Sequence, residues 1–117
     1  MGYIQKREVR QKEIVLLKVP FSNLRESKLR PAIVVSNNDV NRQSGDCILV
    51  PLTSVLKDAP YAVAITQNDL AYGEILKESR ARADKIFTAE KDIIVEKVGQ
   101  VTEVKFQQIK QQITATL

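Results

Sequence analysis

The chain has 117 residues, of which 44% are hydrophobic and 27% charged, and a formal net charge of +4 at pH 7. This length and composition predict one folded domain, residues 1–117, and exclude a disordered chain. With no histidine and a single cysteine, Cys47, the chain cannot form an internal disulfide, a Cys/His nucleophilic pair or the usual zinc sites. We therefore expect Cys47 in the core, no cofactor, and a cytoplasmic location.

The distribution of apolar residues and glycines excludes further classes of protein. No apolar run approaches the length that crosses a membrane, and the charged N-terminus lacks a signal-peptide core. The glycines, at positions 2, 45, 73 and 99, are too far apart for a phosphate-binding loop. The net charge permits a polyanionic partner without requiring one. We expect a soluble protein with no membrane partner.

The chain opens with a polar, basic stretch over residues 1–12, which we interpret as a solvated extension. Residues 13–19, Glu-Ile-Val-Leu-Leu-Lys-Val, predict the first strand, which Pro20 ends. A polar loop over residues 20–29 follows, of about the length at which connections begin to carry function.

The loop leads directly to Arg30. Pro31 biases Arg30 toward extended geometry, and the apolar run over residues 32–35 predicts a central strand covered on both faces. The sequence thus holds a guanidinium at the start of a buried strand, which suits a phosphate or a carboxylate. A loop arginine paired to a neighbouring carboxylate is the alternative.

Turn residues over 37–39 and 43–46 then close a hairpin onto a third strand over residues 47–52. This strand ends in two hydroxyl residues, Thr53 and Ser54. If the second and third strands pair as a hairpin, the start of one lies beside the end of the other, so that Arg30 and Thr53 become neighbours. The alternative for Thr53 and Ser54 is that they cap their own backbone in a turn.

The second half of the chain contains a strand over residues 61–66, a turn-rich connection over 68–77 and a strand over 79–87. Residues 93–101 are a further strand candidate. A C-terminal helix over 102–117, with Thr102 as N-cap, carries an apolar stripe of Phe106, Ile109, Ile113 and Leu117. Five or six short strands and a terminal helix predict a mostly β, α+β fold, a small antiparallel barrel.

The strand over residues 79–87 has unusual content. Alternation places Arg80, Arg82 and Asp84 on one face and small residues, among them Ser79, on the other. The charged face is either a solvated ladder of ion pairs, which would contribute little to stability, or part of a functional site together with Arg30 and Thr53.

At this point the sequence resembles the MazF/PemK toxins of type II toxin-antitoxin systems. The resemblance rests on Glu-Ile-Val-Leu-Leu-Lys-Val-Pro-Phe, Ser-Lys-Leu-Arg-Pro-Ala-Ile-Val-Val-Ser and Ile-Leu-Val-Pro-Leu-Thr-Ser, in that order. A later block, Gly-Glu-Ile-Leu-Lys-Glu-Ser-Arg-Ala-Arg-Ala-Asp-Lys-Ile-Phe-Thr, is similar to the family's second conserved segment. The resemblance implies a homodimeric SH3-like barrel of the MazF/PemK/CcdB kind, which cleaves single-stranded RNA without metal. It also implies an antitoxin that occupies the same groove.

The resemblance also implies roles for individual residues. Arg30 and Thr53 match the catalytic arginine and threonine of the family, and Arg82 and Asp84 match a pair implicated in some members. Residues that we expect to contact RNA are Arg25, Lys28, Ser54, Ser79 and Arg80. Two departures stand out: Lys12-Glu13 replaces the family's Gly-Asp or Gly-Glu opening, and Phe87 stands where several members have arginine.

The hypothesis for the chemistry is attack by the RNA 2′-hydroxyl on the adjacent phosphate, which gives a 2′,3′-cyclic phosphate and a 5′-hydroxyl end. Arg30 and Arg82 would stabilise charge, Thr53 would donate a hydrogen bond, and Asp84 would accept the 2′ proton. Two alternatives remain open. The first is a barrel that binds RNA or a protein without cutting, as gyrase poisons of the related fold do, and the second is a structural or regulatory barrel.

Overall fold

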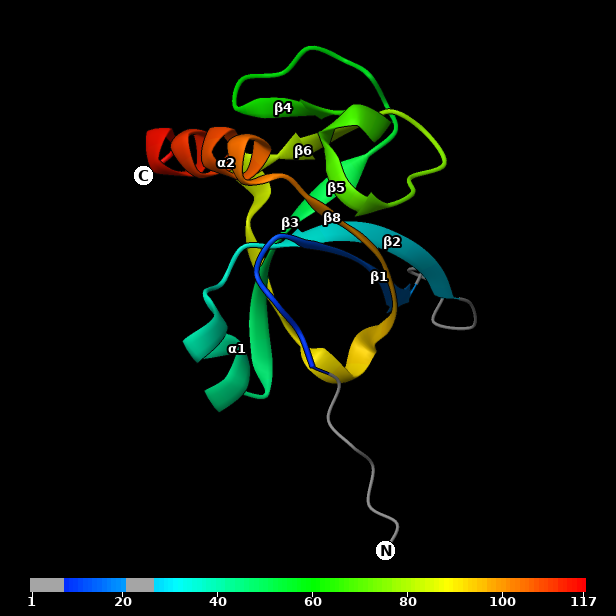
Figure 1. The fold of residues 1–117 in the computed structure, drawn as a ribbon, viewed down its shortest axis with the longest axis vertical. Coiled ribbons are helices and arrows are strands. Elements are labelled where there is room, and N and C mark those ends of the chain that lie inside the picture. Colours follow the sequence, from blue (N-terminus) through cyan, green and yellow to red (C-terminus); the bar gives the residue numbers. More distant parts are fainter. Residues whose placement is uncertain (1–7, 21–26) are drawn as a thin grey trace, which may run out of the picture.

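The computed structural model describes residues 8–20 and 27–117 (Figure 1). Eight strands and two helices follow one another as β1 (Glu13–Pro20), β2 (Ser27–Val34), α1 (Asn38–Gln43), β3 (Asp46–Thr53), β4 (Ala62–Ile65), β5 (Leu70–Gly73), β6 (Ser79–Arg82), β7 (Phe87–Glu90), β8 (Ile94–Val101) and α2 (Glu103–Ala115). Three short 3₁₀ turns lie between them, η1 (Gln67–Asp69), η2 (Ala83–Lys85) and η3 (Lys91–Ile93).

The strands form one curled antiparallel sheet in the order β4-β6-β3-β2-β1-β8-β5, with β7 paired to the first half of β3. In Figure 1 the long strands β1, β2, β3 and β8 bend around one another, and α2 lies beside β4 and β6. The predicted mostly β, antiparallel barrel with a terminal helix is confirmed.

Two apolar clusters fill the two sides of this sheet, because alternate residues of each long strand point to opposite faces. One cluster contains Ile14, Ile33, Val50, Leu52, Val63, Ile65, Ala81, Val101, Phe106 and Ile109. The other contains Val9, Val15, Leu17, Ala32, Val34, Cys47, Leu49 and Ile94. Cys47 is 1% exposed, as expected of a core residue.

Helix α2 covers the first cluster. The hydroxyl of Thr102 accepts a hydrogen bond from the Lys105 amide at 3.2 Å, as predicted for the N-cap. Phe106 and Ile109 are buried, whereas Leu117 is 93% exposed, so the predicted apolar stripe ends before the last residue.

Several elements differ from the predictions. The strand expected over residues 79–87 is two strands, β6 and β7, separated by η2, and the two pair with different parts of β3. The connection over 68–77 contains β5, and the turn region after β2 contains α1, whose N-cap Asn37 accepts from the Val40 amide at 2.9 Å. These elements have four to six residues, too few for a periodic pattern to develop.

The N-terminal stretch is only partly described, and residues 1–7 lie outside the described part. Val9 is 4% exposed and packs in the second cluster, so the expected solvated extension does not hold there. Lys12 has a φ of 80°, the left-handed region that favours glycine. Glycine adopts this geometry without strain, so the Lys12-Glu13 departure noted in the sequence falls at a strained backbone position. Here the Lys12 ammonium pairs with Glu103 and lies 6.0 Å from the centre of the Phe106 ring.

Candidate active site

A cleft of about 830 Å³ opens between the β1–β2 pair, the end of β3, the segment joining β5 to β6, and β8. Its lining is largely apolar and includes Leu16, Leu29, Pro31, Leu52, Ile75, Leu76 and Val98. Five of the predicted site residues also line it: Lys28, Arg30, Thr53, Ser54 and Ser79. Arg25 lies outside the described residues. The cleft therefore combines apolar walls with cationic and hydroxyl side chains.

Strand register places Arg30, Thr53 and Arg80 in one row. Strands β2 and β3 pair antiparallel with Ala32 opposite Pro51, and continuing this register by two residues puts Arg30 opposite Thr53. On the far side of β3, Thr53 pairs directly with Arg80 of β6. Opposed residues share a face, at about 4.5–5.5 Å between Cβ atoms. Arg30 and Thr53 both line the cleft, whereas Arg80, which lies opposite Thr53, is not among its lining residues.

The Thr53 hydroxyl has a defined orientation. Its Oγ1 accepts a hydrogen bond from the Val55 amide at 3.1 Å, so the turn-capping alternative correctly describes its local contact. A hydroxyl that accepts from the backbone still has its own proton to donate. Thr53 is half-buried and lines the cleft, so that this proton is available to a ligand there.

Arg82 and Asp84 form a pair away from the cleft. The Arg82 guanidinium donates to both carboxylate oxygens of Asp84, Nε to Oδ1 at 3.0 Å and Nη2 to Oδ2 at 2.9 Å. This hydrogen-bonded pairing with Arg82 lowers the pKa of Asp84 below its ordinary value. Neither residue lines the cleft, since Arg82 lies opposite Ala62 at the far end of β6. The ion-pair alternative therefore describes Arg82 with Asp84, and also Arg80, which pairs with Glu78 at 3.3 Å; of the two arginines, Arg80 is the one opposite Thr53.

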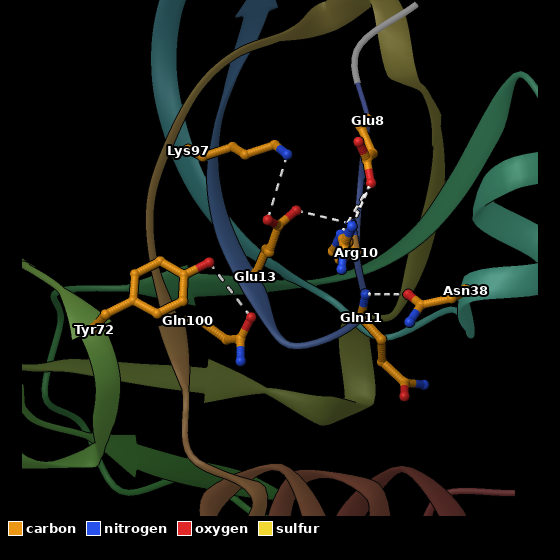
Figure 2. A network of polar contacts seen from close by, with 8 residues as sticks. All are labelled: Glu8, Arg10, Gln11, Glu13, Asn38, Tyr72, Lys97 and Gln100. Carbon is orange, nitrogen blue, oxygen red and sulfur yellow. Dashed lines mark hydrogen bonds and ion pairs between the residues drawn. The ribbon is translucent and has the colours of Figure 1, made fainter.

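A buried carboxylate supports the β8 side of the cleft. Glu13 is 3% exposed, its Oε1 accepts from the Arg10 amide at 2.7 Å, and its Oε2 lies 3.4 Å from the Lys97 ammonium. Figure 2 shows this arrangement, with Arg10 also held by Glu8. Lys97 therefore lines the cleft, but its ammonium pairs with Glu13 of the first strand.

The opposite wall is held by one amide side chain that the sequence analysis missed. Gln67 of η1 donates to the Gly73 carbonyl at 2.9 Å and accepts from the Ile75 amide at 3.0 Å. This clamp fixes the segment that carries Glu74, Ile75 and Leu76 into the wall. A glutamine in a polar turn has no distinctive sequence signal, so only the structure could identify it.

Among residues 8–20 and 27–117, no three acidic or cysteine side chains lie together as a metal site would require. In the same part of the chain, no helix is long and apolar enough to cross a bilayer.

Comparison with solved structures defines the class of fold. The chain matches an "Endoribonuclease from Mycobacterial species" with a TM-score of 0.75 and 23% identity, over 94% of this chain and 91% of the other. It matches a second structure, an "Endoribonuclease in complex with its cognate antitoxin from Mycobacterial species", with a TM-score of 0.74 and 23% identity, over 93% and 92% of the chains. A MazE-MazF crystal structure from Deinococcus radiodurans gives a TM-score of 0.76 at 17% identity, over 93% and 95%. The fold is that of the MazF barrels.

Sequence comparison identifies the family. The chain is 31% identical over 88 residues to Endoribonuclease MazF4 of Mycobacterium tuberculosis, covering 75% of this chain and 78% of the relative. The profile of the PemK-like, MazF-like toxins of type II toxin-antitoxin systems matches residues 10–117. The chain belongs to this family, and the resemblance that its motifs suggested is confirmed.

Proposed function

We propose that this protein is the toxin of a type II toxin-antitoxin pair and a metal-independent endoribonuclease that cleaves single-stranded RNA at short sequences. The observation that carries the proposal is that Arg30 of β2 and Thr53 at the end of β3 both line the cleft. Family membership and the name endoribonuclease given to its relatives support it.

In the proposed reaction the RNA supplies its own nucleophile. The 2′-hydroxyl oxygen attacks the adjacent phosphorus while its proton passes to solvent water, the bond from phosphorus to the 5′ oxygen breaks, and the leaving oxygen takes up a proton from water. The products are a 2′,3′-cyclic phosphate and a 5′-hydroxyl end. Arg30 stabilises the charge that develops on the phosphate, and the Thr53 hydroxyl donates a hydrogen bond to a phosphate oxygen.

Arg80 is the second cation that we assign to the phosphate. It pairs with Thr53 in the β3–β6 ladder, and its side chain is 19% exposed and held by Glu78 at 3.3 Å. A guanidinium so placed can bind the phosphate from the side opposite Arg30.

The hypothesis that Asp84 accepts the 2′ proton has two observations against it. The Arg82 pairing lowers the pKa of Asp84, which makes the carboxylate a weaker base, and the pair lies outside the cleft. We therefore propose that Arg82, ordered by Asp84, holds the RNA strand beyond the cleft and does not transfer protons.

The apolar part of the cleft suits a protein partner. Leu29 and Leu76, which are 48% and 99% exposed, are large apolar residues on its border, typical of a surface that another chain covers. We propose that a cognate antitoxin binds here and excludes RNA, in line with relatives solved with an antitoxin. We further propose, from the family resemblance, a homodimer that acts in the cytoplasm, where messenger RNA is translated.

The test incubates the purified protein with a long unstructured RNA in EDTA and maps the ends that form. We expect discrete cuts with 5′-hydroxyl ends, loss of cutting in Arg30→Ala, and unchanged cutting in Arg42→Ala, an exposed arginine on α1 away from the cleft. Arg80→Ala should impair cutting more than Arg82→Ala. Intact RNA with folded protein would instead favour a binding module without catalysis.

A further inference from the structure

Strand β8 carries two β-bulges that flank Glu96 and Lys97. Ile14 and Val15 of β1 face Gly99 and Lys97, so Val98 is an extra residue, and Leu16 and Leu17 face Glu96 and Ile94, so Val95 is another. Bulges bend a strand and re-aim its side chains, and they are common beside active sites. The strong curvature of β8 around β1 is visible in Figure 1.

Between the bulges, the two charged residues have different environments. Lys97 lies opposite Val15 and reaches buried Glu13 (Figure 2). Glu96 lies opposite Leu16 and lines the cleft. Its exposed carboxylate makes no ion pair or hydrogen bond with the other residues that the structure describes. The Glu13–Lys97 contact thus anchors the strand, and the adjacent carboxylate remains available to a ligand.

A carboxylate at this place is unfavourable for phosphate binding, because it repels the RNA backbone. It is suited to base recognition, because its two oxygens accept hydrogen bonds from neighbouring N–H groups. Guanine presents two such donors side by side on its pairing edge, N1–H and the N2 amino group, whereas uracil presents one donor between two acceptors. The Glu96 carboxylate therefore suits the pairing edge of guanine better than that of uracil.

The spacing fits a base next to the cut. Glu96 faces Leu16 of β1, and Leu16 faces Pro31, the residue after Arg30 on β2. Two strand spacings, about 10 Å, therefore separate Glu96 from the Arg30 strand. Arg30 lies opposite Leu17, so its side chain points to the other face of the sheet from Glu96 and Leu16. Both side chains nevertheless line the cleft, which places the carboxylate for a neighbouring nucleotide and not for the phosphate held by Arg30 and Thr53.

We propose that Glu96 is a specificity-determining residue of this cleft, which accepts hydrogen bonds from an unpaired guanine beside the scissile phosphate. This inference rests on the proposed function for the identity of the ligand as RNA. The other cleft carboxylate, Glu74, lies on the segment joining β5 to β6 and outside the strand ladder, so we assign it no base contact.

Binding is measured with 2′-fluoro RNA randomised in sequence, which cannot supply the nucleophile, followed by sequencing of the bound fraction. We expect one position enriched in guanine over uracil by about 10- to 100-fold, the discrimination typical of a paired base contact. In Glu96→Gln the enrichment should move toward adenine, since an amide matches one donor and one acceptor. Glu74→Gln removes the same charge from the same cleft and should keep the guanine preference.

The outcomes separate this inference from the proposed function. Unchanged guanine enrichment in Glu96→Gln, no enriched position in the wild type, or equal loss of preference in Glu74→Gln would each overturn the inference. Cleavage of natural RNA is mapped in parallel. A Glu96→Gln protein that is folded but cuts no RNA would also overturn it, by placing Glu96 in the chemistry. A wild type that binds with preference but never cuts would refute the nuclease and leave the base contact standing.

Discussion

The role of the Thr53 hydroxyl is tested by replacing it with groups of similar shape. Thr53→Val keeps the branched side chain and removes the hydroxyl, and Thr53→Ser keeps the hydroxyl and removes a methyl group. Because Oγ1 already accepts from the Val55 amide at 3.1 Å, its proton is the part directed at substrate. We therefore expect Thr53→Val to be strongly impaired and Thr53→Ser to be close to wild type.

The size of the effect follows from the environment. Removing one donor from an oxyanion-type site lowers kcat by about 100- to 1000-fold. Thr53 is half-buried and borders an open cleft, where water can partly replace the lost donor, so we expect the lower end, about 100-fold. The fold should be unaffected, because Val55 is exposed and its amide can bond to water, which keeps the stability change below about 0.5 kcal/mol.

The assay follows initial rates on a fluorescent oligonucleotide with a single ribonucleotide at the cut, with urea unfolding as the control for the fold. A Thr53→Val protein within threefold of wild type would show that the hydroxyl does not act on the phosphate. A Thr53→Ser protein as slow as Thr53→Val would show that the methyl group, and thus packing, is the essential part.

Three further predictions concern stability and reactivity. Because Lys12 has a φ of 80°, Lys12→Gly should be more stable to urea than Lys12→Ala. The expected difference is about 0.5–1 kcal/mol, because the greater unfolded-state entropy of glycine offsets part of the relieved strain. A less stable Lys12→Gly protein would contradict the strain. Arg82→Ala should raise the pKa of Asp84 in an NMR titration. The Asp84 pKa is lowered in the folded protein, so the pair stabilises the fold above the unfolded pKa, and this contribution is lost as pH falls through the folded pKa. In the variant this contribution is absent, so stability should fall less steeply over that pH range, and an unmoved Asp84 titration would count against the pairing. Burial raises the pKa of the Cys47 thiol to about 11, so an aromatic disulfide reagent at pH 8 should label it only after unfolding, and rapid labelling of the native protein would disprove its burial.

The sequence predicted the parts of the fold whose signal is local. The first three strands are eight residues each and apolar enough to be recognised on their own, and α2 has both an N-cap and a 3.6-residue stripe. Strands β5 and β7 have four residues each, all of them exposed or half-buried. They are strands because β8 and β3 offer them hydrogen-bonding partners, and a partner distant in sequence leaves no local pattern.

The difference between local signals and long-range pairing also explains which parts of the site the sequence could predict. Arg30 and Thr53 could be brought together from sequence because a hairpin relates the start of one strand to the end of the next. Alternation along residues 79–84 correctly put Arg80 and Arg82 on one face, but it could not say which of them faces Thr53.

That choice depends on the register between β3 and β6, in which Leu52 lies opposite Ala81. A register shift by two residues would keep every side chain on its face and would exchange Arg80 for Arg82 beside Thr53. A two-residue shift would bring Ala83, an alanine like Ala81, opposite Leu52, so side-chain size alone does not choose the register. It is held by the simultaneous pairing of β6 with β4, in which Ala81 lies opposite Val63, and by the turn η2, which begins at Ala83. The pairing of β6 with both β3 and β4 thus determines which arginine lies opposite Thr53, which is why the arrangement of the site cannot be read from the charged residues alone.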